Sequence, residues 1–250
     1  MKKLILIVSF LGFFSAFSFG QLIDEKNVTV TMDLQPVLQL HMTTSDQVDF
    51  VFDDIREYYG GIIKYAATIL KVSSSVSWDL YAVGTSQNGT TWDQQMSYST
   101  VVNPNSVSAL PLSLLELHQY EANAFGVAGL DYSALFQASN VAVPVTGQNS
   151  IYNSATPYTA PLATDKYIQG SAGTGLLLGA PGGSYLTEVP AAGAFSNFYF
   201  TIDYRILPGL PAVFPMAGTS ALVSEALVPP QYAEPGVYTM NAKYILLEDQ

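Results

Sequence analysis

Apolar and polar side chains alternate one by one through the closing stretch PGVYTMNAKYILLEDQ, residues 235–250. The apolar set comprises Tyr238, Met240, Ala242, Tyr244 and Leu246. The mostly polar set between them comprises Val237, Thr239, Asn241, Lys243 and Ile245. Because successive side chains of an extended chain point to opposite faces, the alternation predicts a half-buried strand. We expect this strand to close a sheet rather than to fray.

The same alternation runs through NFYFTIDYRIL, residues 197–207. One face carries Phe198, Phe200, Ile202, Tyr204 and Ile206. This stretch and the closing one share an aromatic residue, alternating polar positions, a basic residue and an aliphatic end. We therefore expect the two strands to be neighbours in one sheet.

Near the N-terminus, residues 28–40 also alternate, with Val28, Val30, Met32, Leu34, Leu38 and Leu40 on one face. The pattern predicts one long strand or two collinear strands. Pro36 requires a bulge or an edge position, because proline has no N–H to donate to a neighbouring strand. The next stretch, QVDFVFDD, places Val48, Phe50 and Phe52 inward, and Gly60-Gly61 indicates a turn.

Two more strands are indicated by ATILKVSSSVSWDLYAVGT, residues 67–85. Trp78 shares a face with Val76, Leu80 and Ala82, which predicts a core position for the indole. The stretch VSALPLSLLELHQYE, residues 107–121, is compatible with a helix, but Pro111 and its alternating pattern favour a strand.

Strand patterns recur with turn residues between them, and no long amphipathic helix interrupts them. This arrangement predicts an all-β fold, an antiparallel β-sandwich of immunoglobulin-like or jelly-roll-like type, with long ordered loops and little helix. We expect a single domain over residues 21–250, with a low-charge, loop-rich middle at residues 85–194. The chain has no cysteine, so a core without disulfides must stabilise it.

The first twenty residues have the composition of a secretory signal peptide. Lys2 and Lys3 precede the apolar run LILIVSFLGFF, and Ser18 and Gly20 place small residues before a cleavage site. A membrane anchor is less favoured, because the apolar run is shorter than the ~20 residues that span a bilayer. We expect cleavage after Gly20, export to the cell surface or beyond, and no membrane span in the mature chain.

The charge is strongly acidic, with 9 Lys+Arg against 20 Asp+Glu and a net charge of −11. Loss of the two leader lysines leaves 7 against 20, a net charge of −13. Such a chain repels phosphate backbones and anionic lipid surfaces, so nucleic acid is not an expected partner.

Candidate chemical groups are few. The acidic group Asp46, Asp49, Asp53, Asp54 and Glu57 has the ligand type that Ca²⁺ prefers, but it lacks EF-hand spacing and also fits a solvated edge. The two histidines, His41 and His118, lie within apolar alternation, without cysteine or a Gly-x-Ser-x-Gly elbow nearby. We predict no catalytic residue, no metal site and no cofactor.

Two further features are ambiguous. The run GSAGTGLLLGAPGG carries Gly173, Gly175 and Gly179 but no following helix, so it predicts a close-packed loop rather than a dinucleotide site. The tyrosine-rich stretch IYNSATPYTAPLATDKY, residues 151–167, suits either a sugar- or protein-binding surface or simple packing of long loops.

Trp78-Asp79-Leu80 within LKVSSSVSWDLYAVGT and Gly236-Val237-Tyr238 near the end resemble the strands of WxL-like secreted surface proteins. With FDDIREYYGGI, they also resemble β-sandwich envelope proteins of the Bacteroidetes. The resemblance implies an exported surface protein. It departs from the WxL pattern in lacking a second Trp-x-Leu near the C-terminus, which puts peptidoglycan attachment in doubt.

We therefore expect a non-enzymatic, exported structural or adhesive protein. Its terminal strands either pair within one molecule or exchange between copies, which makes self-association or contact with other surface proteins the expected partnership. The alternative is a carbohydrate-binding module or carbohydrate-active enzyme with its glycan site in the tyrosine-rich middle.

Overall fold

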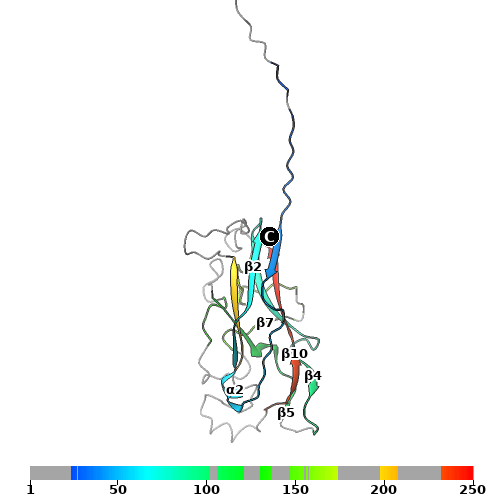
Figure 1. The fold of residues 1–250 in the computed structure, drawn as a ribbon, viewed down its shortest axis with the longest axis vertical. Helices are drawn as coiled ribbons and strands as arrows, with labels where there is room; N and C mark the ends of the chain where they lie inside the picture. Colours follow the sequence, from blue (N-terminus) through cyan, green and yellow to red (C-terminus); the bar gives the residue numbers. More distant parts are fainter. Residues whose placement is uncertain are drawn as a thin grey trace, which may run out of the picture. The chain divides into compact units, whose positions relative to one another are not determined.

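The computed structural model divides the chain at Pro36 into two units, Met1–Gln35 and Pro36–Gln250 (Figure 1). The backbone is described for residues 24–26, 28–101, 106–120, 130–136, 147–154, 156, 158–173, 198–207 and 232–249. The predicted signal peptide, residues 1–20, lies outside these ranges. In the described part of the chain, no helix is long and apolar enough to cross a membrane.

The larger sheet of the second unit contains four antiparallel strands in the order β1-β2-β8-β6. The strands are β1 (Leu38–Met42), β2 (Ile62–Ser74), β8 (Tyr199–Ile206) and β6 (Leu115–Gln119). A bulge at residues 65–67 interrupts the pairing of β2 with β8, and Ala66 there has a φ of 48°. Its N–H donates to Asp203 Oδ1 at 2.7 Å, which holds the bulge in place.

A second sheet has the order β11-β3-β7. It consists of β11 (Asn241–Glu248), β3 (Trp78–Thr85) and the short parallel strand β7 (Tyr152–Asn153). Two smaller pairs accompany it: β10 with β4 and β5 with β9. Their bounds are β10 (Gly236–Thr239), β4 (Asp93–Ser97), β5 (Ser106–Val107) and β9 (Tyr232–Ala233).

The core combines inward faces from both sheets, as the alternating patterns predict. Its members include Leu70, Trp78, Leu80, Leu117, Phe200 and Ile202. Trp78 is fully buried and contacts Phe198 and Phe200, with ring centroids 6.1 and 6.3 Å away. The prediction of an all-β antiparallel sandwich with little helix is confirmed, and so is the core position of Trp78.

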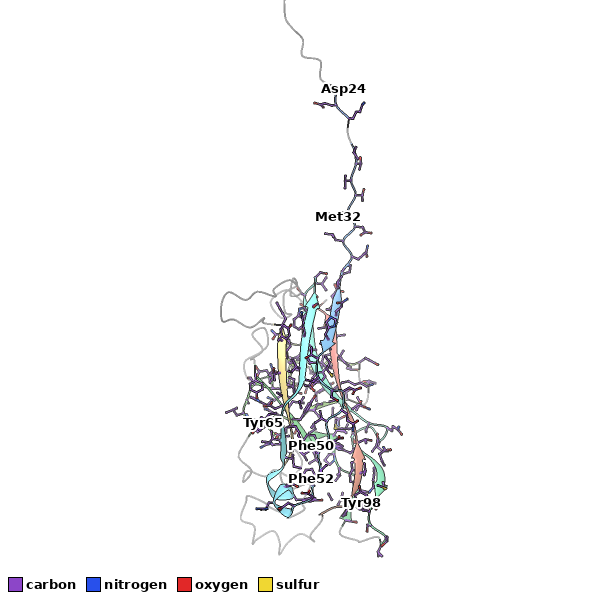
Figure 2. The ribbon with its side chains drawn as sticks, viewed as in Figure 1. Asp24, Met32, Phe50, Phe52, Tyr65 and Tyr98 are labelled. Atoms are coloured by element: carbon purple, nitrogen blue, oxygen red, sulfur yellow. The ribbon has the colours of Figure 1, made fainter. Side chains whose placement is uncertain are left out.

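The prediction of a long first strand is wrong for its N-terminal half. Residues 28–37 belong to none of the described strands, and β1 begins only at Leu38. Four apolar side chains of the alternating set remain exposed: Val28 at 84%, Val30 at 85%, Met32 at 77% and Leu34 at 82% (Figure 2). Pro36 lies two residues before the edge strand β1, so its lack of an N–H leaves no neighbouring strand without a donor.

The expected pairing of the closing strand with residues 198–206 is also wrong. Strand β8 lies between β2 and β6, so both of its edges are occupied. Strand β11 instead pairs with β3, from Asn241 opposite Thr85 to Glu248 opposite Trp78. Similar sequence patterns mark similar half-buried environments, but they carry no information about which strand lies next to which.

Two local predictions need refinement. The expected turn at Gly60-Gly61 is preceded by a helical turn, α2 (Ile55–Gly60), which begins at a capping box formed by Asp54 and Glu57. The ambiguous stretch at residues 107–121 forms a 3-10 turn (Leu112–Leu114) followed by strand β6, so the strand preference holds for Leu115–Gln119.

Candidate functional site

A groove of about 540 Å³ opens in the second unit between the chain that follows β1 and the strands β10 and β11. One side is formed by residues 45–50 and the other by residues 238–242 with Tyr244. Its floor contains Thr68, Trp92, Leu115 and Tyr204. The groove therefore reaches the main core between the two sheets.

Three hydroxyl groups lie in a row on the floor. Thr68 Oγ1 is 2.8 Å from the Tyr204 hydroxyl, which is 2.5 Å from that of Tyr244. Burial raises the pKa of Tyr204, and burial together with the neighbouring phenol raises the pKa of Tyr244 well above its ordinary value. Both phenols therefore stay neutral at physiological pH and satisfy each other as hydrogen-bond partners.

The walls combine apolar with polar side chains. Val48, Phe50 and Met240 line the groove and also pack against the main core. Tyr238 donates its hydroxyl to the Glu234 carbonyl at 2.7 Å, and burial raises the pKa of its phenol to about 12. The apolar part of this lining suits the alternate apolar side chains of an extended segment.

The predicted acidic group is spread over the groove rim and the start of α2. Asp46 and Asp49 line the groove as exposed residues three positions apart. Asp54 caps α2 and pairs with Arg56, while Glu57 accepts from the backbone N–H groups of Asp53 and Asp54. Within the described ranges, no three His, Cys, Asp or Glu side chains converge on a metal-sized site.

Strands β10 and β11 form one edge of the groove, and no described strand pairs with their other side, which we call the open side. Strand β4 pairs with β10, and β3 pairs with β11 on the same side. Asp249 N–H donates to the Ser77 carbonyl, so odd-numbered residues of β11 direct their backbone groups towards β3. The backbone N–H and C=O groups of the even-numbered residues Ala242, Tyr244 and Leu246 therefore point to the open side. Strand β1 lies near this edge, but no described backbone hydrogen bond joins the two.

Residues 47–53, which we name the cover segment, lie on the opposite side of the groove. Val48, Phe50 and Phe52 are half-buried against the core, as predicted, and Gln47, Asp49, Val51 and Asp53 are exposed. Although this pattern is that of a strand, the described residues offer the segment no backbone hydrogen bond to a neighbouring strand. Among the described residues, it is side-chain packing that attaches the cover segment to the core.

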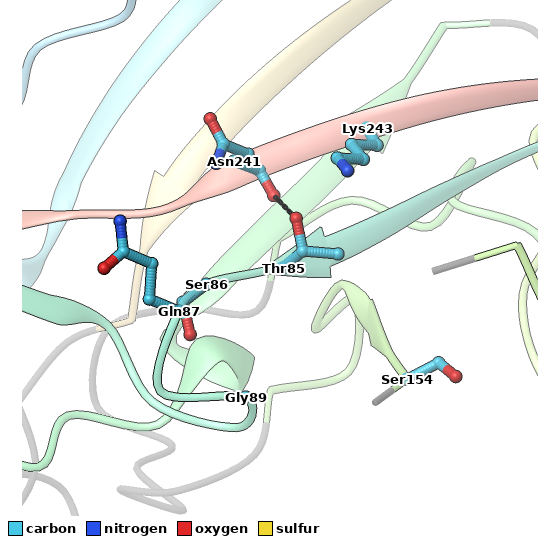
Figure 3. A pocket seen from close by; sticks show the side chains of 7 residues that line it. All are labelled: Thr85, Ser86, Gln87, Gly89, Ser154, Asn241 and Lys243. Carbon is cyan, nitrogen blue, oxygen red and sulfur yellow. Dashed lines mark hydrogen bonds between the residues drawn. The ribbon is translucent and has the colours of Figure 1, made fainter. Parts of the chain in front are cut away.

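A second hollow of about 260 Å³, lined by polar residues, lies beside the turn after β3 (Figure 3). It is lined by Thr85, Ser86, Gln87, Gly89, Ser154, Asn241 and Lys243. The Lys243 ammonium lies 5.7 Å from the ring centroid of Tyr158, whose side chain is 75% exposed. This hollow is where the tyrosine-rich stretch of residues 151–167 meets the sheet.

The two histidines have different surroundings. His41 is exposed on β1, whereas His118 is buried on β6, with Nδ1 3.0 Å from Asp203 Oδ2. Next to this pair, Arg205 Nε donates to Glu116 Oε2 at 2.6 Å, and the guanidinium lies 4.7 Å from the Phe136 ring. Each pair joins residues directly opposite each other on β6 and β8.

A further buried carboxylate lies on β3. Asp79 is 8% exposed, and burial and the charge of Asp249 raise its pKa to about 7. Gly170, with a φ of 81°, lies directly against it, and a Cβ at this position would lie 1.7 Å from Asp79 Oδ1. Of the predicted glycine-rich loop, Gly175 and Gly179 lie outside the described residues, and Gly173 lies inside them.

No known family model matches the sequence, and a search of curated proteins found no significant relative. Any functional inference therefore depends on the groove, the open edge and the exposed N-terminal segment. The sequence pattern predicted the alternating faces of β11 and of the N-terminal segment. It missed the groove and the buried pairs, because both depend on which distant segments lie together.

Proposed function

We propose that the protein is an exported structural or adhesive component that assembles with copies of itself at the cell surface. Its connecting element is the stretch of residues 28–34, which we name the donor segment. The observation that carries the proposal is that this segment has the alternation of a strand while its four apolar side chains are 77–85% exposed. The resemblance to secreted surface proteins and the signal-peptide composition of residues 1–20 support the proposed location.

Exposed apolar side chains on an extended segment favour addition to a sheet. Burying each such side chain stabilises a complex by about 1.5–3 kcal/mol, and the main-chain hydrogen bonds of an added strand align it. Four of them supply roughly 6–12 kcal/mol by the same measure, which is comparable to the ~4–15 kcal/mol cost of association. The expected assembly is therefore reversible and dependent on concentration.

The test uses two double variants of the protein that starts at Gln21. Val30→Asp with Met32→Asp places two charges on the apolar face of the donor segment. Thr29→Asp with Thr31→Asp places the same charges on its polar face, one position away. We expect the first variant to be monomeric and the second to assemble like the parent, as measured by light scattering and electron microscopy.

If residues 28–34 take no part in assembly, the two double variants should assemble to the same extent. Equal assembly of the two variants, or a parent protein that stays monomeric at high concentration, would contradict the proposal. Deletion of residues 21–35 gives a useful third variant, because it removes the donor segment and leaves β1 complete.

A carbohydrate-binding role is the second candidate, and the polar hollow beside Tyr158 favours it. An exposed aromatic ring next to hydroxyl, amide and ammonium groups is suited to stacking and hydrogen bonding with a sugar. Binding on a glycan array that is lost in Tyr158→Ala and kept in Tyr98→Ala would support this role. No binding by the parent would remove it.

A further inference from the structure

We infer that the open edge of β10 and β11, at residues 238–244, is the acceptor for the donor segment of a second copy of this chain. The donor takes the place now occupied by the cover segment, residues 47–53. This inference rests on the proposed function and adds the site at which the copies join.

The acceptor edge has unused main-chain groups in the right place. One side of β10 and β11 is occupied by β4 and β3. On the other side, Ala242 and Tyr244 direct backbone groups outward, and no described backbone hydrogen bond reaches them. An added strand would satisfy these groups as part of a regular ladder.

Length and pattern also agree. The donor segment and the edge along the groove are both seven residues long, roughly 23 Å at the rise of a strand. Alternate donor side chains would point into the groove, where Trp92, Leu115 and Met240 provide apolar contacts. The groove volume of about 540 Å³ already offers room for part of this set.

The groove floor is suited to contact with an apolar side chain. Its hydroxyl groups on Thr68, Tyr204 and Tyr244 bond to one another, so an apolar side chain above them leaves no hydroxyl unpaired. In the single chain, the donor side chains Val30 and Met32 remain exposed, which leaves them free for another molecule.

The cover segment is suited to displacement. It presents Val48, Phe50 and Phe52 to the core with the spacing that Val28, Val30 and Met32 share. Its described residues contribute no ladder hydrogen bonds, whereas the donor would contribute both apolar contacts and a ladder. Exchange therefore replaces one apolar face by another and adds main-chain hydrogen bonds.

The absence of natural cysteine allows a direct test. Two single-cysteine proteins with tags of different mass are mixed and oxidised: Met32→Cys as the donor and Met240→Cys as the acceptor. The matched control is Met96→Cys, a methionine on β4 that lies on the occupied side of β10. We expect disulfide-linked mixed dimers of Met32→Cys with Met240→Cys to be at least about tenfold more abundant than those with Met96→Cys.

Each outcome separates the two proposals. If the parent assembles but Met32→Cys links equally to both partners, the acceptor site is wrong and the proposed function stands. If the parent assembles and a Met32→Cys/Met240→Cys double variant links only within one molecule, the segment returns to its own groove and the inference is overturned. If nothing assembles and no mixed dimer forms, both are wrong.

Discussion

Trp78 is fully buried at the start of β3, between Phe198 and Phe200. Trp78→Ala removes the largest side chain of the core and should lower the free energy of unfolding by about 3–5 kcal/mol. Tyr98→Ala, at a side chain that is 62% exposed, should change it by less than about 0.5 kcal/mol. Urea denaturation followed by fluorescence or circular dichroism checks both, and equal midpoints would place Trp78 at the surface.

Asp79 gives stability an unusual dependence on pH. The folded protein raises its pKa from 3.8 to about 7, so between these values the folded state holds a proton that the unfolded state has lost. Stability from this group is therefore largest at low pH and decreases as the pH rises towards 7.

Asp79→Asn removes this charge and should raise the free energy of unfolding by about 1–3 kcal/mol at pH 8, with a much smaller gain near pH 4. The control is Asp46→Asn, at an exposed carboxylate on the groove rim, and its effect on stability should not change with pH in this way. Thermal melts of both variants and the parent across this pH range measure the effect. A gain that is the same at every pH would show that Asp79 does not titrate as described.

Strands β6 and β8 are joined on their outer face by two buried pairs. Glu116 is fully buried and Arg205 is 4% exposed, so either charge alone would be left without its partner. Arg205→Met should therefore destabilise the protein by about 3–5 kcal/mol, whereas Glu116→Leu combined with Arg205→Met should recover much of that loss. Chemical denaturation of the two single variants and the double variant gives the coupling energy, and strictly additive losses would contradict the pairing.

The cover segment is expected to control the rate of assembly. Phe52 packs against the core and against Tyr58, with ring centroids 5.1 Å apart, but does not line the groove. Phe52→Ala should loosen the cover segment without removing donor contacts, and so should increase the assembly rate several-fold. Val51→Ala, at a side chain that is 68% exposed, should leave the rate unchanged in time-resolved light scattering. A slower rate in Phe52→Ala would argue that the cover segment is part of the acceptor.

Alternation in the sequence predicted the faces of β3, β8 and β11 well, because a side chain on a strand has only two directions to choose from. Pairing was not predictable in the same way, as β11 shows by lying beside β3 rather than β8. Asp203 and Arg205 had the pattern of a polar outer face but are buried, and Phe136, from a distant loop, packs over Arg205. The donor segment has the same alternation as a paired strand, so the sequence pattern could not predict that its apolar side chains are exposed.

The molecule as a whole is acidic, with a net charge of −11, and charge repulsion opposes contact between copies. Assembly should therefore increase when the salt concentration is raised from about 0.02 M to about 0.3 M, because the screening length becomes shorter than the distance between most charges. Light scattering at fixed protein concentration measures this. Assembly that decreases with salt would indicate a contact made by opposite charges instead of by apolar strands.

The pairing of β3 with β11 also governs when the chain folds. Thr85 Oγ1 donates to the Asn241 carbonyl across 156 positions, and Ala66 donates to Asp203 across 137. Closing loops of this size costs entropy before any core contact compensates, which makes folding slow compared with helical proteins of similar size. Strand β2 can pair early with β1, but it gains its second neighbour β8, and β3 gains β11, only after most of the chain has been synthesised. Slow closure of these long-range pairs would suit the proposed export, in which a chain passes through a narrow channel before it folds.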